Sequence, residues 1–84
     1  MPASPVGLVG RLTLPVRSSS APGEIELTVG GLLERYIAYS AERIPRGGVA
    51  LVIQDRGDRS VDVVPWAVAP GLGVDPDAAG RLER

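Results

Sequence analysis

GEIELTVGGLLERYIAYS, residues 23–40, carries the clearest β-hairpin signal in the sequence. Two runs rich in aliphatic and aromatic residues flank Gly30 and Gly31, and two consecutive glycines supply the positive φ angles of a two-residue primed turn. Counting outward from this turn fixes the register and places Glu26 opposite Arg35. Such a cross-strand charge pair contributes on the order of a few tenths of a kcal/mol. Residues 23–40 are therefore predicted to form two paired strands.

A strand is also predicted before the hairpin. Residues 8–17 alternate apolar and polar side chains with the period of two that a half-buried strand requires. Pro15 cannot donate to a strand ladder, so this strand is expected to lie at an edge or to contain a bulge. A polar loop over residues 18–23 connects it to the hairpin.

Two more strands are predicted after the hairpin. The segment IPRG, residues 44–47, fits a type I turn with Pro45 in the second position. Apolar runs over residues 49–54 and 60–64 follow, joined through DRGD, residues 55–58. Five short strands with tight connections predict an all-β barrel or sandwich.

The predicted core follows from the alternation within each strand, because successive side chains point to opposite faces. One face of every strand is assigned inward, and the barrel then encloses Leu12, Leu14, Ile25, Leu27, Tyr36, Ala38, Val49, Leu51, Ile53, Val61 and Val63. The barrel domain is predicted over residues 7–69, after a flexible N-terminus over residues 1–6. Residues 70–84 are predicted to be a disordered tail, with a short helix capped at Asp75 as the alternative.

Composition excludes most enzyme chemistries. The 84 residues contain no histidine and no cysteine, and all nine basic residues are arginines. Hydrolysis by Ser-His-Asp or Cys-His groups, zinc catalysis and Schiff-base chemistry therefore lack their residues, as does a lysine-dependent phosphate loop. Two carboxylate pairs, Asp55 with Asp58 and Asp75 with Asp77, are interpreted as solvated turn or tail residues. The chain is therefore predicted not to be an enzyme and to have no catalytic residues. It is also predicted to bind no cofactor or metal.

The sequence offers two further functional interpretations, an adhesion motif and a nucleic-acid-binding barrel, and each has a simpler alternative. The RGD at residues 56–58 resembles an adhesion motif, but a charged hairpin turn explains it without a secreted context. Barrels that bind single-stranded nucleic acid stack bases on aromatic side chains in a basic groove. Residues 1–69 hold seven arginines against seven carboxylates, and few aromatics. Nucleic-acid binding is therefore not the favoured prediction.

The apolar runs are far shorter than a membrane-spanning helix needs, and the N-terminus lacks the pattern of a signal peptide. These features predict a cytoplasmic chain, whose association with a membrane would come through a partner or through a segment outside this sequence.

The order and spacing of the motifs resemble the NfeD-like family, in its carboxyl-terminal domain. The resemblance spans residues 7–66 and rests on GLVGRLTL, GEIELTV, Tyr36 with Ala38, IPRG, VALVI and SVDVVPW. It implies a small five-stranded OB-fold-like β-barrel. It also implies a non-enzymatic module that acts beside membrane-scaffold proteins of the stomatin, prohibitin and flotillin type. The alternative function is that of an OB-fold domain binding single-stranded nucleic acid or oligosaccharide.

Apolar side chains on the outward parity are candidates for a partner-binding surface, because exposed apolar patches usually mark interfaces. The alternative is that the tail or the curl of the sheet covers them. Trp66 either closes the barrel floor or anchors a partner, a common role of tryptophan. Ile37 and Tyr39 are expected to meet a protein partner or a second copy of the chain. The candidate partner-binding residues are Leu33, Ile37, Tyr39, Val52 and Trp66.

Overall fold

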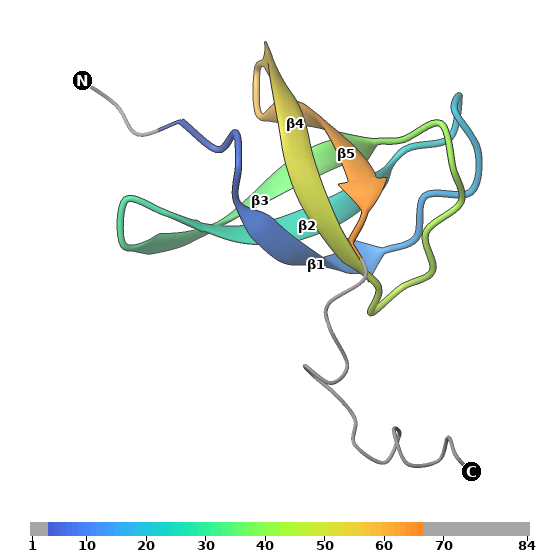
Figure 1. Cartoon of the computed structure of the whole chain (residues 1–84), viewed down its shortest axis with the longest axis horizontal. Helices are drawn as coiled ribbons and strands as arrows, with labels where there is room; N and C mark the ends of the chain where they lie inside the picture. The colour runs from blue at the N-terminus through green and yellow to red at the C-terminus, as the bar shows by residue number, and fades with distance from the viewer. Residues whose placement is uncertain (1–3, 67–84) are drawn as a thin grey trace, which may run out of the picture.

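The computed structural model describes residues 4–66, which contain five β-strands. The strands are β1 (Val9–Leu14), β2 (Gly23–Val29), β3 (Leu32–Tyr39), β4 (Val49–Gly57) and β5 (Ser60–Pro65). They close into a barrel in the order β1-β2-β3-β5-β4, with β4 pairing back onto β1 (Figure 1). Only the β3–β5 pair is parallel. This is the predicted OB-fold-like barrel, whose full closure leaves few exposed edges.

The β2–β3 hairpin has the predicted register. Gly30 and Gly31 form the turn with φ angles of 60° and 87°, and Glu26 lies opposite Arg35. The Arg35 Nε donates to Glu26 Oε2 at 3.4 Å. The hairpin extends beyond the rest of the barrel at its turn, as the long loop at the left of Figure 1 shows. Its turn end is therefore exposed on several sides.

A bulge in β1 places Leu14 outside the core, although it is predicted to lie inside. Leu12 pairs with Ile25 and Leu14 with Glu24, so Thr13 is an extra residue in the ladder. An extra residue turns the following side chain away from its expected face. Leu14 is consequently 54% exposed, and its assignment to the core is wrong.

β4 faces the opposite way from the prediction. Val52 and Ala50 are buried, whereas Ile53 is 51% exposed and Val49 and Leu51 are half-buried on the outside. Apolar residues occupy both parities of this strand, so alternation gives no signal for its orientation.

Packing decides the orientation of β4. Gly10 of β1 lies opposite Ala50, and a Cβ on Gly10 would collide with the Glu26 carbonyl oxygen and the Leu27 side chain. This tight inward side accepts the small Ala50 and not Leu51. The inward placement of Val49, Leu51 and Ile53 is therefore wrong.

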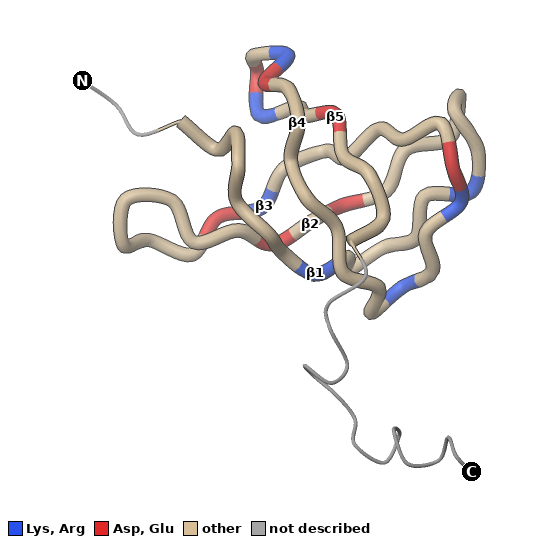
Figure 2. The backbone as a smooth tube through the Cα atoms, viewed as in Figure 1, with Lys and Arg blue, Asp and Glu red and all other residues tan. Residues whose placement is uncertain are grey.

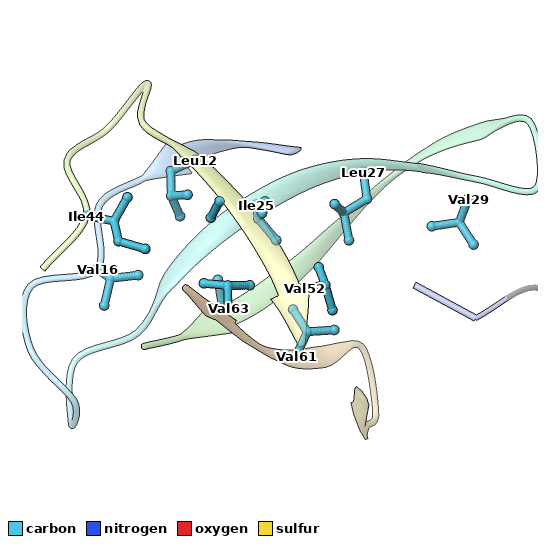
Figure 3. Packing of buried hydrophobic residues seen from close by; sticks show 11 residues of the cluster. Leu12, Val16, Ile25, Leu27, Val29, Ile44, Val52, Val61 and Val63 are labelled. Carbon is cyan, nitrogen blue, oxygen red and sulfur yellow. The ribbon is translucent and has the colours of Figure 1, made fainter. Parts of the chain in front are cut away.

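The core is a single apolar cluster inside the barrel (Figure 3). Tyr36, predicted inside, is half-buried and packs against this cluster. Pro5, before the first strand, is also buried, and its carbonyl accepts the Leu8 N–H. The buried apolar residues are Leu12, Val16, Ile25, Leu27, Val29, Ala38, Ile44, Ala50, Val52, Val61 and Val63.

Two turns differ from their predicted form. The Gly48 N–H donates to the Pro45 carbonyl at 2.9 Å, so the turn begins at Pro45, one residue later than predicted. Its third residue, Gly47, has a φ of 85°, as a type II turn requires. In the β4–β5 hairpin the two turn residues are Asp58 and Arg59, both with positive φ. The RGD triplet thus runs from the end of β4 into this turn.

Candidate interaction surfaces

The outward side of β4 carries a continuous apolar surface. Val9 of β1, Leu51 of β4 and Val64 of β5 lie directly opposite one another across three strands. Directly opposed residues share a face of a sheet, so these side chains form one row. A second row runs from Arg11 of β1 through Val49 to Trp66, so an arginine borders the apolar side chains. We call the surface formed by Val9, Val49, Leu51, Val64 and Trp66 the outer β4 face.

Trp66 belongs to the outer β4 face through its backbone. Its N–H donates to the Val49 carbonyl at 2.9 Å, which continues the β4–β5 ladder by one residue. The alternation from Val64 then places the Trp66 side chain outward. Trp66 is 46% exposed and Val9 is 45% exposed, while the other three members are half-buried. The tryptophan thus stands at one end of an apolar surface.

The other candidate residues separate into different places. Leu33 and Ile37 lie on the outward face of β3 and are 67% and 45% exposed. Arg35 lies between them on this face, and Leu32, beside the hairpin turn, has the opposite parity. We call the outward face of β3 at Leu33 and Ile37 the hairpin surface. Val52 lies in the core with 1% of its surface exposed, so the prediction that it faces outward is wrong. No single surface therefore contains the whole predicted set.

Tyr39 is also on β3, but another side chain covers its ring. The Arg56 guanidinium carbon lies 3.8 Å from the ring centroid, a cation–π geometry. Arg56 is held there by Asp62, whose Oδ1 accepts from Nε at 3.0 Å. Tyr39 is consequently half-buried and offers little of its ring to a partner.

Arg59 covers the free edge of β3. The β3–β5 ladder begins at Ile37, so the earlier part of β3 has a strand on one side only. Arg59 Nη1 donates to the Arg35 carbonyl at 3.3 Å, and Nη2 lies 3.9 Å from Glu34 Oε2. A φ of 61° is costly for a residue other than glycine. These contacts hold Arg59 in that conformation and blunt an edge that would otherwise pair with another chain.

Comparison with known proteins identifies the family. The family model for the NfeD C-terminal domain matches residues 9–64. The chain belongs to this family. A solved structure, the C-terminal domain of a stomatin operon partner protein from Pyrococcus horikoshii, has a TM-score of 0.51 and 23% sequence identity. That similarity covers 74% of this chain and 88% of the other and is a likeness of fold. Comparison with curated proteins found no match.

The other tyrosine of this NfeD C-terminal domain, Tyr36, contacts Glu34 and Arg59 of the same chain. The Tyr36 hydroxyl donates to Glu34 Oε1 at 3.2 Å, and the Arg59 guanidinium lies 5.5 Å from its ring centroid. Partial burial raises the pKa of the Tyr36 phenol, and the hydrogen bond and negative charge of Glu34 raise it further. Both tyrosine rings therefore face an arginine of the same chain.

Six of the fourteen charged side chains in the described part of the NfeD C-terminal domain are in surface pairs. Arg35 with Glu26, Arg56 with Asp62, and Arg59 with Glu34 are the ion pairs among residues 4–66. Over the same range, no group of three histidine, cysteine or carboxylate side chains is arranged to hold a metal ion. Nor does any helix in this part have the length and apolar character to cross a membrane.

Proposed function

We propose that this NfeD C-terminal domain is a non-enzymatic protein-interaction module that docks a membrane-scaffold protein of the stomatin, prohibitin or flotillin type. The observation that carries the proposal is the outer β4 face. It places Val9, Leu51 and Val64 in one apolar row across three strands, with Val49 and Trp66 in the next row beside Arg11, outside a barrel whose core is already filled. Contiguous apolar patches of this kind on small soluble domains mark contact sites.

The composition of the outer β4 face supports a protein partner. Its members are aliphatic or aromatic, and Trp66 is the residue type most enriched at binding hot spots. Val9 and Trp66 are its two most exposed members, while Leu51, in the middle of the first row, is half-buried. A partner that covers this surface would remove apolar area from water without distorting the strands beneath it.

The class of partner comes from the family and from the similar structure. The Pyrococcus domain is named as part of a stomatin operon partner protein. We extend that association to this chain, which would then act at a membrane through the scaffold protein that it binds. A second copy of the chain is the competing occupant of the same surface.

The alternative function, binding of single-stranded nucleic acid or oligosaccharide, has less support. Binding of single strands on an OB-type barrel depends on aromatic rings open for stacking and on a basic groove. Tyr39 is covered by Arg56, and Tyr36 faces Arg59. Three of the seven arginines in residues 4–66 are already paired with carboxylates. Trp66 alone leaves an aromatic ring substantially exposed among these residues.

Co-purification from the native cell tests the proposal. The double variant Val9→Ser/Trp66→Ser changes the outer β4 face, and Leu33→Ser/Ile37→Ser changes the hairpin surface as a matched control. We expect the first variant to lose the scaffold-family protein and the second to retain it, with both folded by circular dichroism. If only the hairpin variant loses the scaffold-family protein, the contact lies on β3 instead. Undiminished recovery with both variants would refute the proposed surface.

A further inference from the structure

Two arginines are held side by side at one end of the barrel by an isolated β-bridge. Val16 and Ile44 exchange both backbone hydrogen bonds, at 2.9 and 3.0 Å, and both side chains are buried in the core. The two chain segments run antiparallel through this bridge. The residues that follow Val16 and precede Ile44, Arg17 and Arg43, are therefore neighbours across it. Their positions are fixed by the bridge and by the core beneath it.

These arginines line a hollow with an apolar wall. Its volume is about 260 Å³, and its lining consists of Pro15, Val16, Arg17, Arg43, Ile44 and Pro45. The two prolines lie on the other side of the bridge from the two arginines. In Figure 2, basic positions of the β1–β2 and β3–β4 connections lie close together at this end of the molecule. The hollow is thus lined by two arginines and two prolines beside the bridge residues.

Arg17 and Arg43 form no ion pair with the described part of the chain. Each of the three ion pairs in residues 4–66 uses another arginine, namely Arg35, Arg56 or Arg59. Glu42 is next to Arg43 in sequence but is not within ion-pair distance of it. Like charges held across a bridge repel, and an anion between them relieves that repulsion.

The backbone of the hollow distinguishes between anions. Phosphate sites usually present a cradle of free main-chain N–H groups. Here Pro15 and Pro45 have no N–H, the N–H groups of Val16 and Ile44 are used in the bridge, and that of Arg17 donates to Ala21. Of the six lining residues, Arg43 alone has a main-chain N–H without a backbone acceptor in residues 4–66. The donors available to a ligand are mainly guanidinium groups, which match carboxylates in planar, two-bond geometry.

We propose that this hollow binds a carboxylate side chain from an acidic segment of a protein. The carboxylate would lie between Arg17 and Arg43, and its methylene groups would pack against Pro15 and Pro45. Glutamate fits this arrangement because it joins a planar anion to a short apolar stem. The site is separate from the outer β4 face and does not depend on which protein binds there.

A titration with a capped tetraglutamate peptide, followed by amide NMR at low salt, tests the site. We expect shifts concentrated at residues 15–17 and 43–45, and weaker binding as salt is added. Arg17→Gln and Arg43→Gln should each weaken binding about five- to tenfold. This is the loss expected when one charge-assisted hydrogen bond is removed at a solvent-exposed site. Arg46→Gln removes the same charge three residues from Arg43, outside the hollow, and should leave affinity nearly unchanged.

Three results would overturn the proposal. An effect of Arg46→Gln as large as that of Arg17→Gln would indicate attraction to general positive charge. Equal binding of a capped tetraglutamine peptide would remove the role of the carboxylate. Tighter binding of inorganic phosphate at the same residues would assign the hollow to phosphate. None of these results bears on the scaffold partner, because the peptide alone is the probe.

Discussion

Leu51 of β4 lies directly opposite Val9 of β1, and both side chains point away from the core of the barrel. The next residue, Val52, points inward and pairs with Val63 inside the barrel. One apolar strand thus supplies both the core and an outward surface. The proposed function depends on this division.

The orientation of β4 predicts unequal costs for two neighbouring truncations. Val52→Ala removes two buried methyl groups and should lower the free energy of unfolding by about 1–3 kcal/mol. Leu51→Ala removes a larger side chain, but one that is half-buried on the outside, and should cost less. Urea denaturation of the two variants measures both values. A larger loss for Leu51→Ala would place Leu51 inside.

The Gly30–Gly31 turn predicts a local backbone cost without a clash against other residues. A Cβ on Gly31 would meet no atom within 4 Å, but the φ of 87° is unfavourable for other residues. Gly31→Ala should therefore destabilise the barrel by about 1–2 kcal/mol, whereas Gly31→Asn should cost less because asparagine tolerates this region. Thermal unfolding of both variants checks the order. Equal stability of Gly31→Ala and the parent would contradict the assigned turn.

Tyr36 predicts a specific effect at alkaline pH. Its pKa is raised by burial and by Glu34, so the folded state holds the phenol proton more tightly than the unfolded state does. The stability from this effect is fully present below the unfolded pKa of about 10 and is lost as pH rises through the folded pKa. The difference between the spectrophotometric titration curves of the parent and of Tyr36→Phe should show this raised pKa.

Glu34→Gln supplies the control for that titration. It removes the negative charge beside the Tyr36 hydroxyl, at 3.2 Å, and should move the pKa down toward its ordinary value. An unchanged titration in Glu34→Gln would mean that Glu34 has no part in the shift.

Arg17 and Arg43 predict a small gain in stability on loss of charge. Because they are adjacent and unpaired within residues 4–66, Arg17→Gln should raise the free energy of unfolding by about a few tenths of a kcal/mol at low salt. The gain should shrink as salt screens the repulsion. Chemical denaturation at two ionic strengths measures it. A loss of stability at low salt would argue against repulsion between the two residues.

The sequence predicts an element well where a local signal fixes its register. The glycine pair at residues 30–31 anchors the β2–β3 hairpin, so Glu26 and Arg35 are paired as counted. β4 has no such anchor, since both of its faces are apolar, and its orientation depends on the tight contact of Gly10 with a neighbouring strand. Leu14 is misplaced for a related reason, because Pro15 indicates an edge or a bulge in this strand but the alternating pattern does not place the extra residue at Thr13.

The candidate surface was predictable only in part for the same reason. Leu33, Ile37 and Trp66 are exposed, as their positions in the strands indicate. In β4, Val52 faces the core and Leu51 faces outward, which is the reverse of the prediction. Of the partners of Leu51 on the outside, Val64 lies on the next strand, β5, but Val9 lies on β1, which is distant in sequence. Only the closed barrel brings these three residues into one row. The bridge beside Arg17 and Arg43 likewise joins loops that no local pattern connects.

The central claim is that the outer β4 face binds a scaffold protein, and the most direct measurement is a binding titration with purified components. The dissociation constant for the co-purified scaffold-family protein would be compared among the parent, Trp66→Ala and Leu33→Ala, with sedimentation to detect pairing of the chain with itself. The account predicts that Trp66→Ala weakens binding about tenfold or more, as hot-spot tryptophans do, and that Leu33→Ala changes it little. Unchanged affinity for Trp66→Ala in a folded domain would contradict the account.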